Sequence, residues 1–277
     1  MTLLFNDPRQ FIDHYYHFAA ELILGVWRMY AGWLDPTIDK RGNTKLVDPA
    51  RAIFSHCRPD EWRDYTRYNQ YFLHAAFPSI GIETEQDWIG RIVMTNGTYG
   101  KSGDGGKSGT ARAWRFDRVL LVDRSAAFRG EITGALTHRT AASAYFSNSR
   151  KSSQYWWETI RRRVLSFAMV SQEILDYSLP PMPKGNRKEP PILISYLSRQ
   201  GWRRRLIEED HLKLVEALEQ LCDSKGWEFL IFHPEKYTRD KQLEIAARTT
   251  VSVNHGCSST LVDRSLLRLC SAYTEMV

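Results

Sequence analysis

The first candidate for chemistry is an imidazole with a carboxylate on the same side of a helix. His17 and Glu21 are four residues apart, which places both on one helix face, and His14 lies one turn before His17. A carboxylate beside an imidazole sets its tautomer and raises its basicity, as a general base requires. The same spacing also suits a partly buried polar pair that bridges two helices, so the sequence leaves both interpretations open.

The second candidate is a set of polar residues near the ends of predicted strands. Ser198-Arg199 follows an apolar run of strand length, and Arg204 comes five residues later, before a predicted helix. An arginine beside a helix N-terminus is a good site for an anion. His255-Gly256 follows a later predicted strand, and glycine permits close approach of the backbone to a ligand. Because ligands of open α/β sheets bind at the carboxyl ends of strands, we expect these residues to meet one ligand.

The elements that would position this second set form a regular pattern. Three apolar runs have strand length, at 192–197, 227–232 and 249–253. Two helical patterns separate them, at 207–225 and 238–248. The first helix has carboxylates in its first turn and a glycine just after its last turn, where each is favoured. The order βαβαβ predicts a parallel sheet with right-handed crossovers, which is a Rossmann-like half.

The N-terminal part alternates helix and strand patterns less regularly. Helices are predicted at 11–34, 65–77 and 156–175, and strands at 52–54 and 119–122. The segment 178–191 holds 5 of the 11 prolines, and proline interrupts both helices and central strands. We therefore expect an N-terminal α/β lobe at 1–177, a Pro-rich linker at 178–191 and a C-terminal Rossmann-like lobe at 192–277.

The positive charge is local. The chain of 277 residues has a net charge of +6, and the segment 151–205 holds 11 Lys or Arg against 4 Asp or Glu. Arginine triplets lie at 161–163 and 203–205, with tryptophans nearby. Such a segment could bind nucleic acid by gripping phosphates and stacking bases, could bind a phosphate-bearing small molecule, or could form solvated helix faces. The sequence leaves these three interpretations open.

Composition excludes several classes of protein. Hydrophobic residues make up 43% and charged residues 25%, which is typical of a globular chain and excludes a disordered or collagen-like one. The 4 cysteines show neither a CxxC pair nor zinc-ligand spacing, so we expect buried thiols and no metal site. No apolar stretch is long enough to cross a bilayer and the opening residues lack the pattern of a signal peptide, so the chain as written is expected to be soluble, without an anchor.

Together these motifs resemble glycosyltransferase family 61, especially its fungal members. The family includes O-linked N-acetylglucosaminyltransferases that modify EGF domains and plant xylosyltransferases. Its helix with HxxxD or HxxxE is matched by His17 to Glu21, and its strand ending in Ser-Arg before a basic pair and an acidic helix is similar to LSRQGWRRRLIEED at 197–210. Its His-Gly-x-Gly-Leu-Thr is partly matched by VNHGCSST at 253–260, where serines replace the second glycine and the leucine.

The resemblance implies a GT-B fold, in which two Rossmann-like lobes face each other across a cleft. It implies an inverting, metal-independent glycosyltransferase without a cofactor, which moves a sugar from a nucleotide-sugar donor, expected to be UDP-linked, to a hydroxyl of a protein or glycan. His17 and Glu21 would be the catalytic residues on the acceptor side. The resemblance does not decide which of the two is the general base. Ser198, Arg199, Arg204, His255 and Gly256 would bind the donor.

The resemblance also implies how much of the C-terminal lobe is present and in which compartment the protein acts. The family continues past the last matched motif with further strands and helices and carries an N-terminal membrane anchor, so we expect a C-terminal lobe that is incomplete and a chain that is a poor catalyst. Family members act in the Golgi or the ER lumen. The alternatives are a nucleic-acid-binding protein that uses 151–205, although no nucleic-acid partner is implied by the family, and a catalytically inactive remnant of the transferase.

Overall fold

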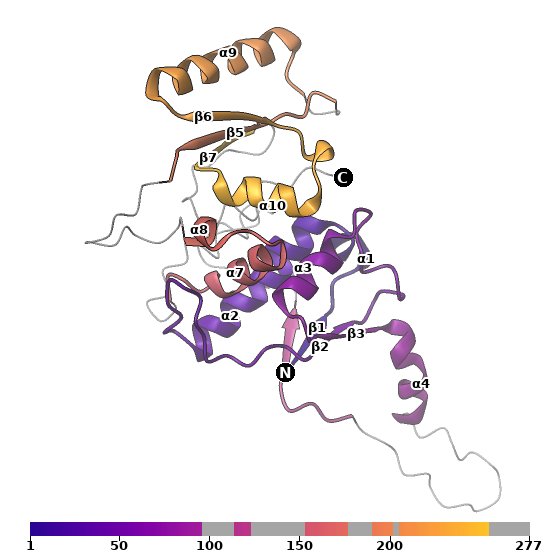
Figure 1. Ribbon diagram of the computed structural model, residues 1–277. Helices are drawn as coiled ribbons and strands as arrows, with labels where there is room; N and C mark the ends of the chain where they lie inside the picture. Colours follow the sequence, from indigo (N-terminus) through magenta and orange to yellow (C-terminus); the bar gives the residue numbers. More distant parts are fainter. Residues whose placement is uncertain (96–113, 123–152, 177–189, 202–204, 255–277) are drawn as a thin grey trace, which may run out of the picture. The chain divides into compact units, whose positions relative to one another are not determined.

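The chain forms two compact units, Met1–Trp157 and Glu158–Val277. The computed structural model describes residues 1–95, 114–122, 153–176, 190–201 and 205–254 (Figure 1). Both units contain a parallel sheet with helical crossovers, which confirms the predicted α/β class.

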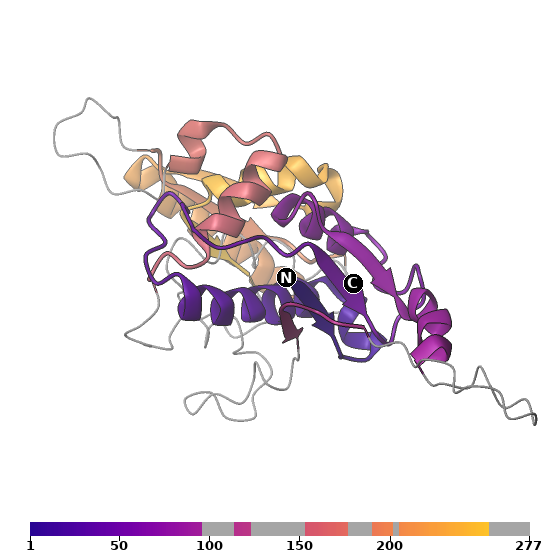
Figure 2. The ribbon, with the colours of Figure 1, turned by 90° about the horizontal axis from the view of Figure 1, so that it is seen from below.

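The sheet of the first unit has four parallel strands in the order β3-β2-β1-β4. The strands are β1 Thr2–Phe5, β2 Arg51–Phe54, β3 Gly81–Thr84 and β4 Val119–Val122. Figure 2 shows the indigo and purple strands running in the same direction. Leu3 of β1 pairs with Ala52 on one side and with Leu120 on the other, so β1 is central. This is the 3-2-1-4 order with which the Rossmann fold begins.

The helices of the first unit follow its strands. They are α1 Arg9–Ile12, η1 His17–Ile23 and α2 Leu24–Leu34 after β1, α3 Tyr68–Ala76 after β2, and α4 Glu85–Thr95 after β3. The predicted single helix at 11–34 is thus wrong in detail, because a π-helical turn separates a short first helix from α2. The predictions for β2, β4 and α3 are confirmed to within a few residues, whereas β1, β3 and α4 were not predicted.

Stacked aromatic rings form the centre of the first unit's core. The ring of Phe5 lies 4.4 Å from that of Phe54, and the ring of Phe54 lies 5.1 Å from that of Trp62. Phe18 of η1 packs on the same group, with its centroid 5.9 Å from Phe5. Each of these side chains is almost fully buried, so η1 is fixed to the carboxyl ends of β1 and β2 by aromatic packing.

The sheet of the second unit has three parallel strands in the order β6-β5-β7. They are β5 Leu193–Leu197, β6 Glu228–Phe232 and β7 Val251–Val253. Helices α9 Glu208–Lys225 and α10 Arg239–Arg248 connect them and lie on opposite faces of the sheet, as right-handed crossovers in opposite directions require (Figure 1). All five residues of β5, the middle strand, are buried, and the predicted strands at 192–197, 227–232 and 249–253 are confirmed to within two residues.

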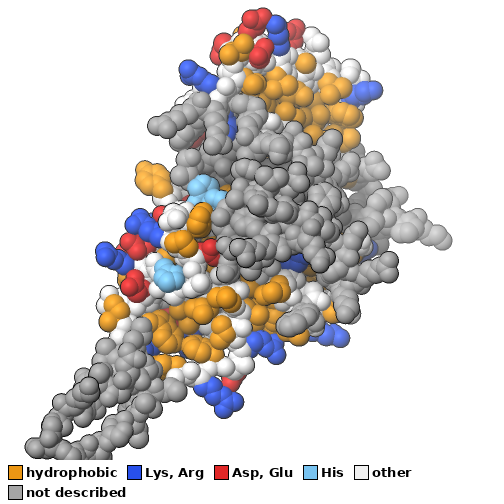
Figure 3. Space-filling view, turned by 180° about the vertical axis from the view of Figure 1, so that it is seen from behind, with side chains coloured by type: hydrophobic (Ala, Val, Ile, Leu, Met, Phe, Trp, Pro, Cys, Tyr) orange, Lys and Arg blue, Asp and Glu red, His pale blue; other side chains and the backbone are white. Residues whose placement is uncertain are grey.

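The caps of these two helices follow the sequence closely. Gly226 ends α9 with φ of 66°, in the left-handed region that favours glycine. Thr238 caps α10 by accepting a hydrogen bond from the backbone of Lys241. Of the residues of α9, only Cys222 is fully buried. Figure 3 shows charged side chains at the top of the view, where α9 lies, and hydrophobic side chains exposed below them.

Two short helices precede β5 in the second unit. They are α7 Glu158–Phe167 and α8 Gln172–Leu175, where the sequence predicted one long helix at 156–175. The chain turns between them at Met169, whose φ is 58°, and Ser171 caps α8 through its side chain. Both helices contact each other and α10, so they belong with the second unit. The sequence had placed the residues up to 177 in the N-terminal lobe, because the Pro-rich segment 178–191 lies beyond them.

Candidate functional site

The carboxyl edge of the β6-β5-β7 sheet is the place where its topology favours ligand binding. The chain leaves β5 toward β6 on one side and reaches β7 on the other, so the topological switch point lies between β5 and β7. Ser198 directly follows β5, and its backbone N–H donates to the carbonyl of Phe232 at 3.0 Å. Asn254 directly follows β7, one residue beyond the pairing of Tyr196 with Val253. Ser198 and Asn254 therefore come from neighbouring strand ends about 5 Å apart.

This edge is buried and polar. Ser198 and Arg199 are 6% and 9% exposed. The Oγ of Ser198, both amide atoms of Gln200 and the Oδ1 of Asn254 are buried, and each lacks a hydrogen-bond partner within the described part of the chain. Sequence reasoning named Ser198 and Arg199 but missed Gln200 and Asn254. Their positions just after two strands of one sheet were the signal that could have found them.

Of the remaining residues and elements predicted for the donor site, the structure describes only the N-terminus of α9. Arg204, His255 and Gly256 lie outside the described residues. The N-terminus of α9, which was expected to help bind an anion, has Glu208, Glu209 and Asp210 in its first turn. These carboxylates stabilise the helix but oppose a second negative charge there. Among the described residues of this edge, Arg199 is therefore the cation that a phosphate site would use.

The predicted contact between His17 and Glu21 is present in η1. Nδ1 of His17 lies 2.7 Å from Oε2 of Glu21. The Glu21 side chain is fully buried, whereas the His17 side chain is 23% exposed. When Glu21 carries its charge it can only accept, so Nδ1 of His17 donates and Nε2 is left as the basic nitrogen. π-helical turns of this kind are frequent at functional sites.

Aromatic rings surround the imidazole of His17. Phe11 meets it edge-on with a centroid distance of 5.6 Å, Tyr16 lies at 5.5 Å, and His14 lies at 4.9 Å. Burial, and then the proximity of His17, lowers the pKa of His14. This shift favours the neutral form of His14.

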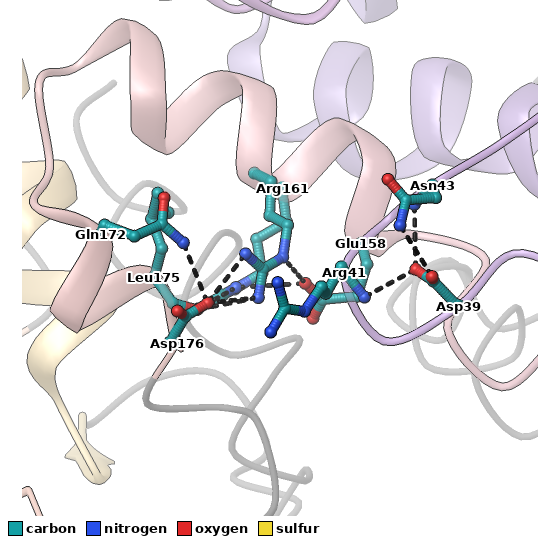
Figure 4. Close-up of polar contacts among 9 residues, drawn as sticks. Asp39, Arg41, Asn43, Glu158, Arg161, Gln172, Leu175 and Asp176 are labelled. Carbon is teal, nitrogen blue, oxygen red and sulfur yellow. Dashed lines mark hydrogen bonds and ion pairs between the residues drawn. The ribbon is translucent and has the colours of Figure 1, made fainter. Parts of the chain in front are cut away.

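The first arginine triplet does not form the basic surface that the sequence suggested. Arg161 is fully buried and Arg162 is 13% exposed in its side chain. Both lie within 3.3 Å of Oε2 of Glu158, and Arg162 also pairs with Asp176 at 3.1 Å. Figure 4 shows the guanidinium of Arg161 directed at Glu158 and at the end of α8. Two of the cations that a nucleic-acid interface would use are thus committed to an internal ion-pair network.

Burial dominates the electrostatics of this network. It raises the pKa of Glu158 against the opposing effect of the two arginines, and it lowers the pKa of Arg161 against the opposing effect of Glu158. Burial without compensation would be costly for each group, so the pairs depend on one another. We infer that this network stabilises the packing of α7 against α8.

Within the described residues, no group of three His, Cys, Asp or Glu side chains could hold a metal ion. No described helix is both long and apolar enough to span a membrane. Comparisons of the chain with protein-family models, with curated proteins and with solved structures find no match.

Cys57 should be inert to thiol reagents. It is fully buried, and burial raises its pKa to about 12, so almost none of it is the reactive thiolate at pH 8. We expect peptide-resolved labelling by iodoacetamide at pH 8 to modify Cys57 only after unfolding in urea. Rapid labelling of Cys57 in the native protein would contradict the burial of its thiol.

Proposed function

We propose that the chain is an inverting, metal-independent glycosyltransferase of the GT-B type, related to glycosyltransferase family 61. The observation that carries the proposal is the 2.7 Å contact between the partly exposed imidazole of His17 and the buried carboxylate of Glu21. A hydroxyl nucleophile needs such a base, and a carboxylate that holds the opposite ring nitrogen stabilises the imidazolium that forms. The parallel sheets of both units suit a Rossmann-type enzyme.

In the proposed reaction, Nε2 of His17 removes the proton from an acceptor hydroxyl. The oxygen attacks the anomeric carbon of the donor sugar from the face opposite the leaving group, the bond to the nucleoside diphosphate breaks, and the configuration inverts. Glu21 keeps the protonated imidazole in place. Because the leaving diphosphate gains negative charge as the bond breaks, a cation at the donor site accelerates the step.

The donor site is proposed at the carboxyl edge of β5. Arg199 would neutralise the diphosphate, with Ser198 beside it. By the resemblance, Arg204, His255 and Gly256 would complete the site, the donor would be a UDP-sugar, and the acceptor would be a protein or glycan hydroxyl in the Golgi or ER lumen. The test is a thermal-shift screen of UDP-sugars, followed by a radiolabelled transfer assay with the best donor. Tight binding of short RNA with a steep salt dependence, and no UDP binding, would favour a nucleic-acid-binding protein instead.

Arg199→Ala should weaken UDP binding by about tenfold to a hundredfold, because a hydrogen bond to a charged group contributes ~1.5–3 kcal/mol. Isothermal titration calorimetry with UDP measures the change. Arg205→Ala is the matched control, since Arg205 lies in the same segment but is exposed. Equal UDP affinity in Arg199→Ala and the wild type would remove Arg199 from the donor site.

A further inference from the structure

The strongest unexplained feature is the group of unsatisfied polar atoms at the β5–β7 edge. They are Oγ of Ser198, Oε1 and Nε2 of Gln200, and Oδ1 of Asn254, all buried and without a hydrogen-bond partner among the described residues. Buried polar side chains are almost always hydrogen-bonded in native proteins. Several unsatisfied groups at one topological switch point therefore indicate that a binding partner supplies the missing hydrogen bonds.

The chemistry of Gln200 restricts what that partner can be. Its carbonyl oxygen needs a donor and its NH₂ group needs an acceptor, and this remains true if the amide is turned over, because both ends lack partners. A phosphate ionised at neutral pH presents acceptor oxygens and so can satisfy only the NH₂ end. A hydroxyl pair or an imide edge presents a donor and an acceptor side by side. Gln200 is thus suited to a neutral part of a ligand, not to its phosphates.

Arg199 is the charged residue of the same segment. It lies between Ser198 and Gln200 in the chain and is 9% exposed. A cation and neutral donor–acceptor groups in one short segment after a strand match a ligand that joins an anionic group to a neutral polar one. Nucleoside diphosphates have this composition, with ribose hydroxyls and base edges beside the phosphates.

We propose that Gln200, together with Ser198 and Asn254, binds the nucleoside part of the donor, while Arg199 binds its diphosphate. The inference rests on the proposed function and adds residues that determine donor specificity. The neutral group that Gln200 contacts is either the ribose diol or the imide edge of uracil, and the two sources share the same donor–acceptor chemistry.

The test compares Gln200→Leu with Gln242→Leu by calorimetry and thermal unfolding. Gln242 is a buried glutamine in the same unit whose amide donates to the carbonyls of Pro234 and Tyr237 at 2.9 and 3.0 Å. Gln200→Leu should weaken UDP binding about tenfold or more, leave pyrophosphate binding unchanged and not lower the melting temperature of the free protein. Gln242→Leu should lower the melting temperature and leave UDP affinity unchanged, because it breaks hydrogen bonds that the free protein already makes.

Two UDP analogues distinguish the sources. If the ribose is the contact, 2′-deoxy-UDP should bind the wild type and Gln200→Leu with equal affinity. If the uracil base is the contact, N3-methyl-UDP should bind the wild type and Gln200→Leu with equal affinity. Either result supports the proposal, and the analogue that binds both proteins equally identifies the part of UDP that Gln200 contacts.

Three outcomes would overturn the inference. Equal UDP affinity in Gln200→Leu and the wild type would show that UDP does not contact Gln200, and would leave the transferase proposal intact. A parallel loss of UDP and pyrophosphate affinity, or a fall in melting temperature like that of Gln242→Leu, would make Gln200 structural. Absence of UDP binding and of sugar transfer in the wild type would remove the inference together with the proposed function.

Discussion

Replacing His17 by alanine should lower the rate of sugar transfer by about 10²–10⁴-fold while leaving the affinity for UDP close to that of the wild type. The variant lacks the nitrogen that would accept the hydroxyl proton, and it leaves the described residues of the proposed donor edge unchanged. Turnover with a radiolabelled UDP-sugar and calorimetry with UDP give the two quantities. The turnover of Glu21→Gln should lie between those of the wild type and His17→Ala. An amide retains the size of the carboxylate but cannot stabilise the imidazolium.

His56→Ala is the matched control for His17→Ala. His56 lies just after β2 in the same unit, and its Nε2 lies 3.2 Å from Oδ1 of Asn6 at the surface. We expect its loss to change turnover little. If His17→Ala instead reduced UDP binding while turnover per bound donor stayed constant, His17 would be a structural residue and the general-base proposal would be wrong.

Glu158→Ala should lower the free energy of unfolding by about 3–5 kcal/mol, because it leaves the guanidinium of Arg161 buried without its carboxylate. Arg161 and Glu158 are 0% and 3% exposed in their side chains, and their charged atoms lie 3.3 Å apart. Urea unfolding followed by tryptophan fluorescence measures the loss. Replacing Glu158 and Arg161 together by methionine should cost less than Glu158→Ala alone, since apolar side chains of similar size leave no unpaired charge.

Glu209→Ala is the control for a surface ion pair in the same unit. Glu209 lies 2.6 Å from Nζ of Lys213, but its side chain is 73% exposed. Exposed pairs contribute little to stability, so this variant should unfold near the wild-type urea concentration. A loss in Glu158→Ala no larger than that in Glu209→Ala would show that water reaches the Glu158 network.

The sequence determined the second sheet because its signals are local. The all-apolar run of β5, the glycine after α9 and the threonine before α10 each act within a few residues, so their effects could be predicted without knowledge of tertiary contacts. The contact between His17 and Glu21 was also predictable, since four residues of helical chain bring two side chains to one face.

Short elements of the first unit escaped prediction because their stability comes from neighbouring strands. β1 has four residues and occupies the sheet centre only because β2 and β4 pair with it on both sides. The π-helical turn at 17–23 and the break at Met169 carry no glycine or proline to mark them. Long-range packing decides such positions, and no local pattern records it.

Tertiary structure alone decided which polar residues matter. Arg161 and Arg162 look like part of a basic surface in the sequence, but Asp176 and the end of α8, 13 or 14 residues away, fold back and bury them with Glu158. Gln200 carries no charge and belongs to no motif, so only its buried, unsatisfied amide makes it a candidate ligand residue. The physical reason is the same in both cases. Burial sets whether a charge or an amide must find a partner, and burial is a property of the folded chain rather than of its order of residues.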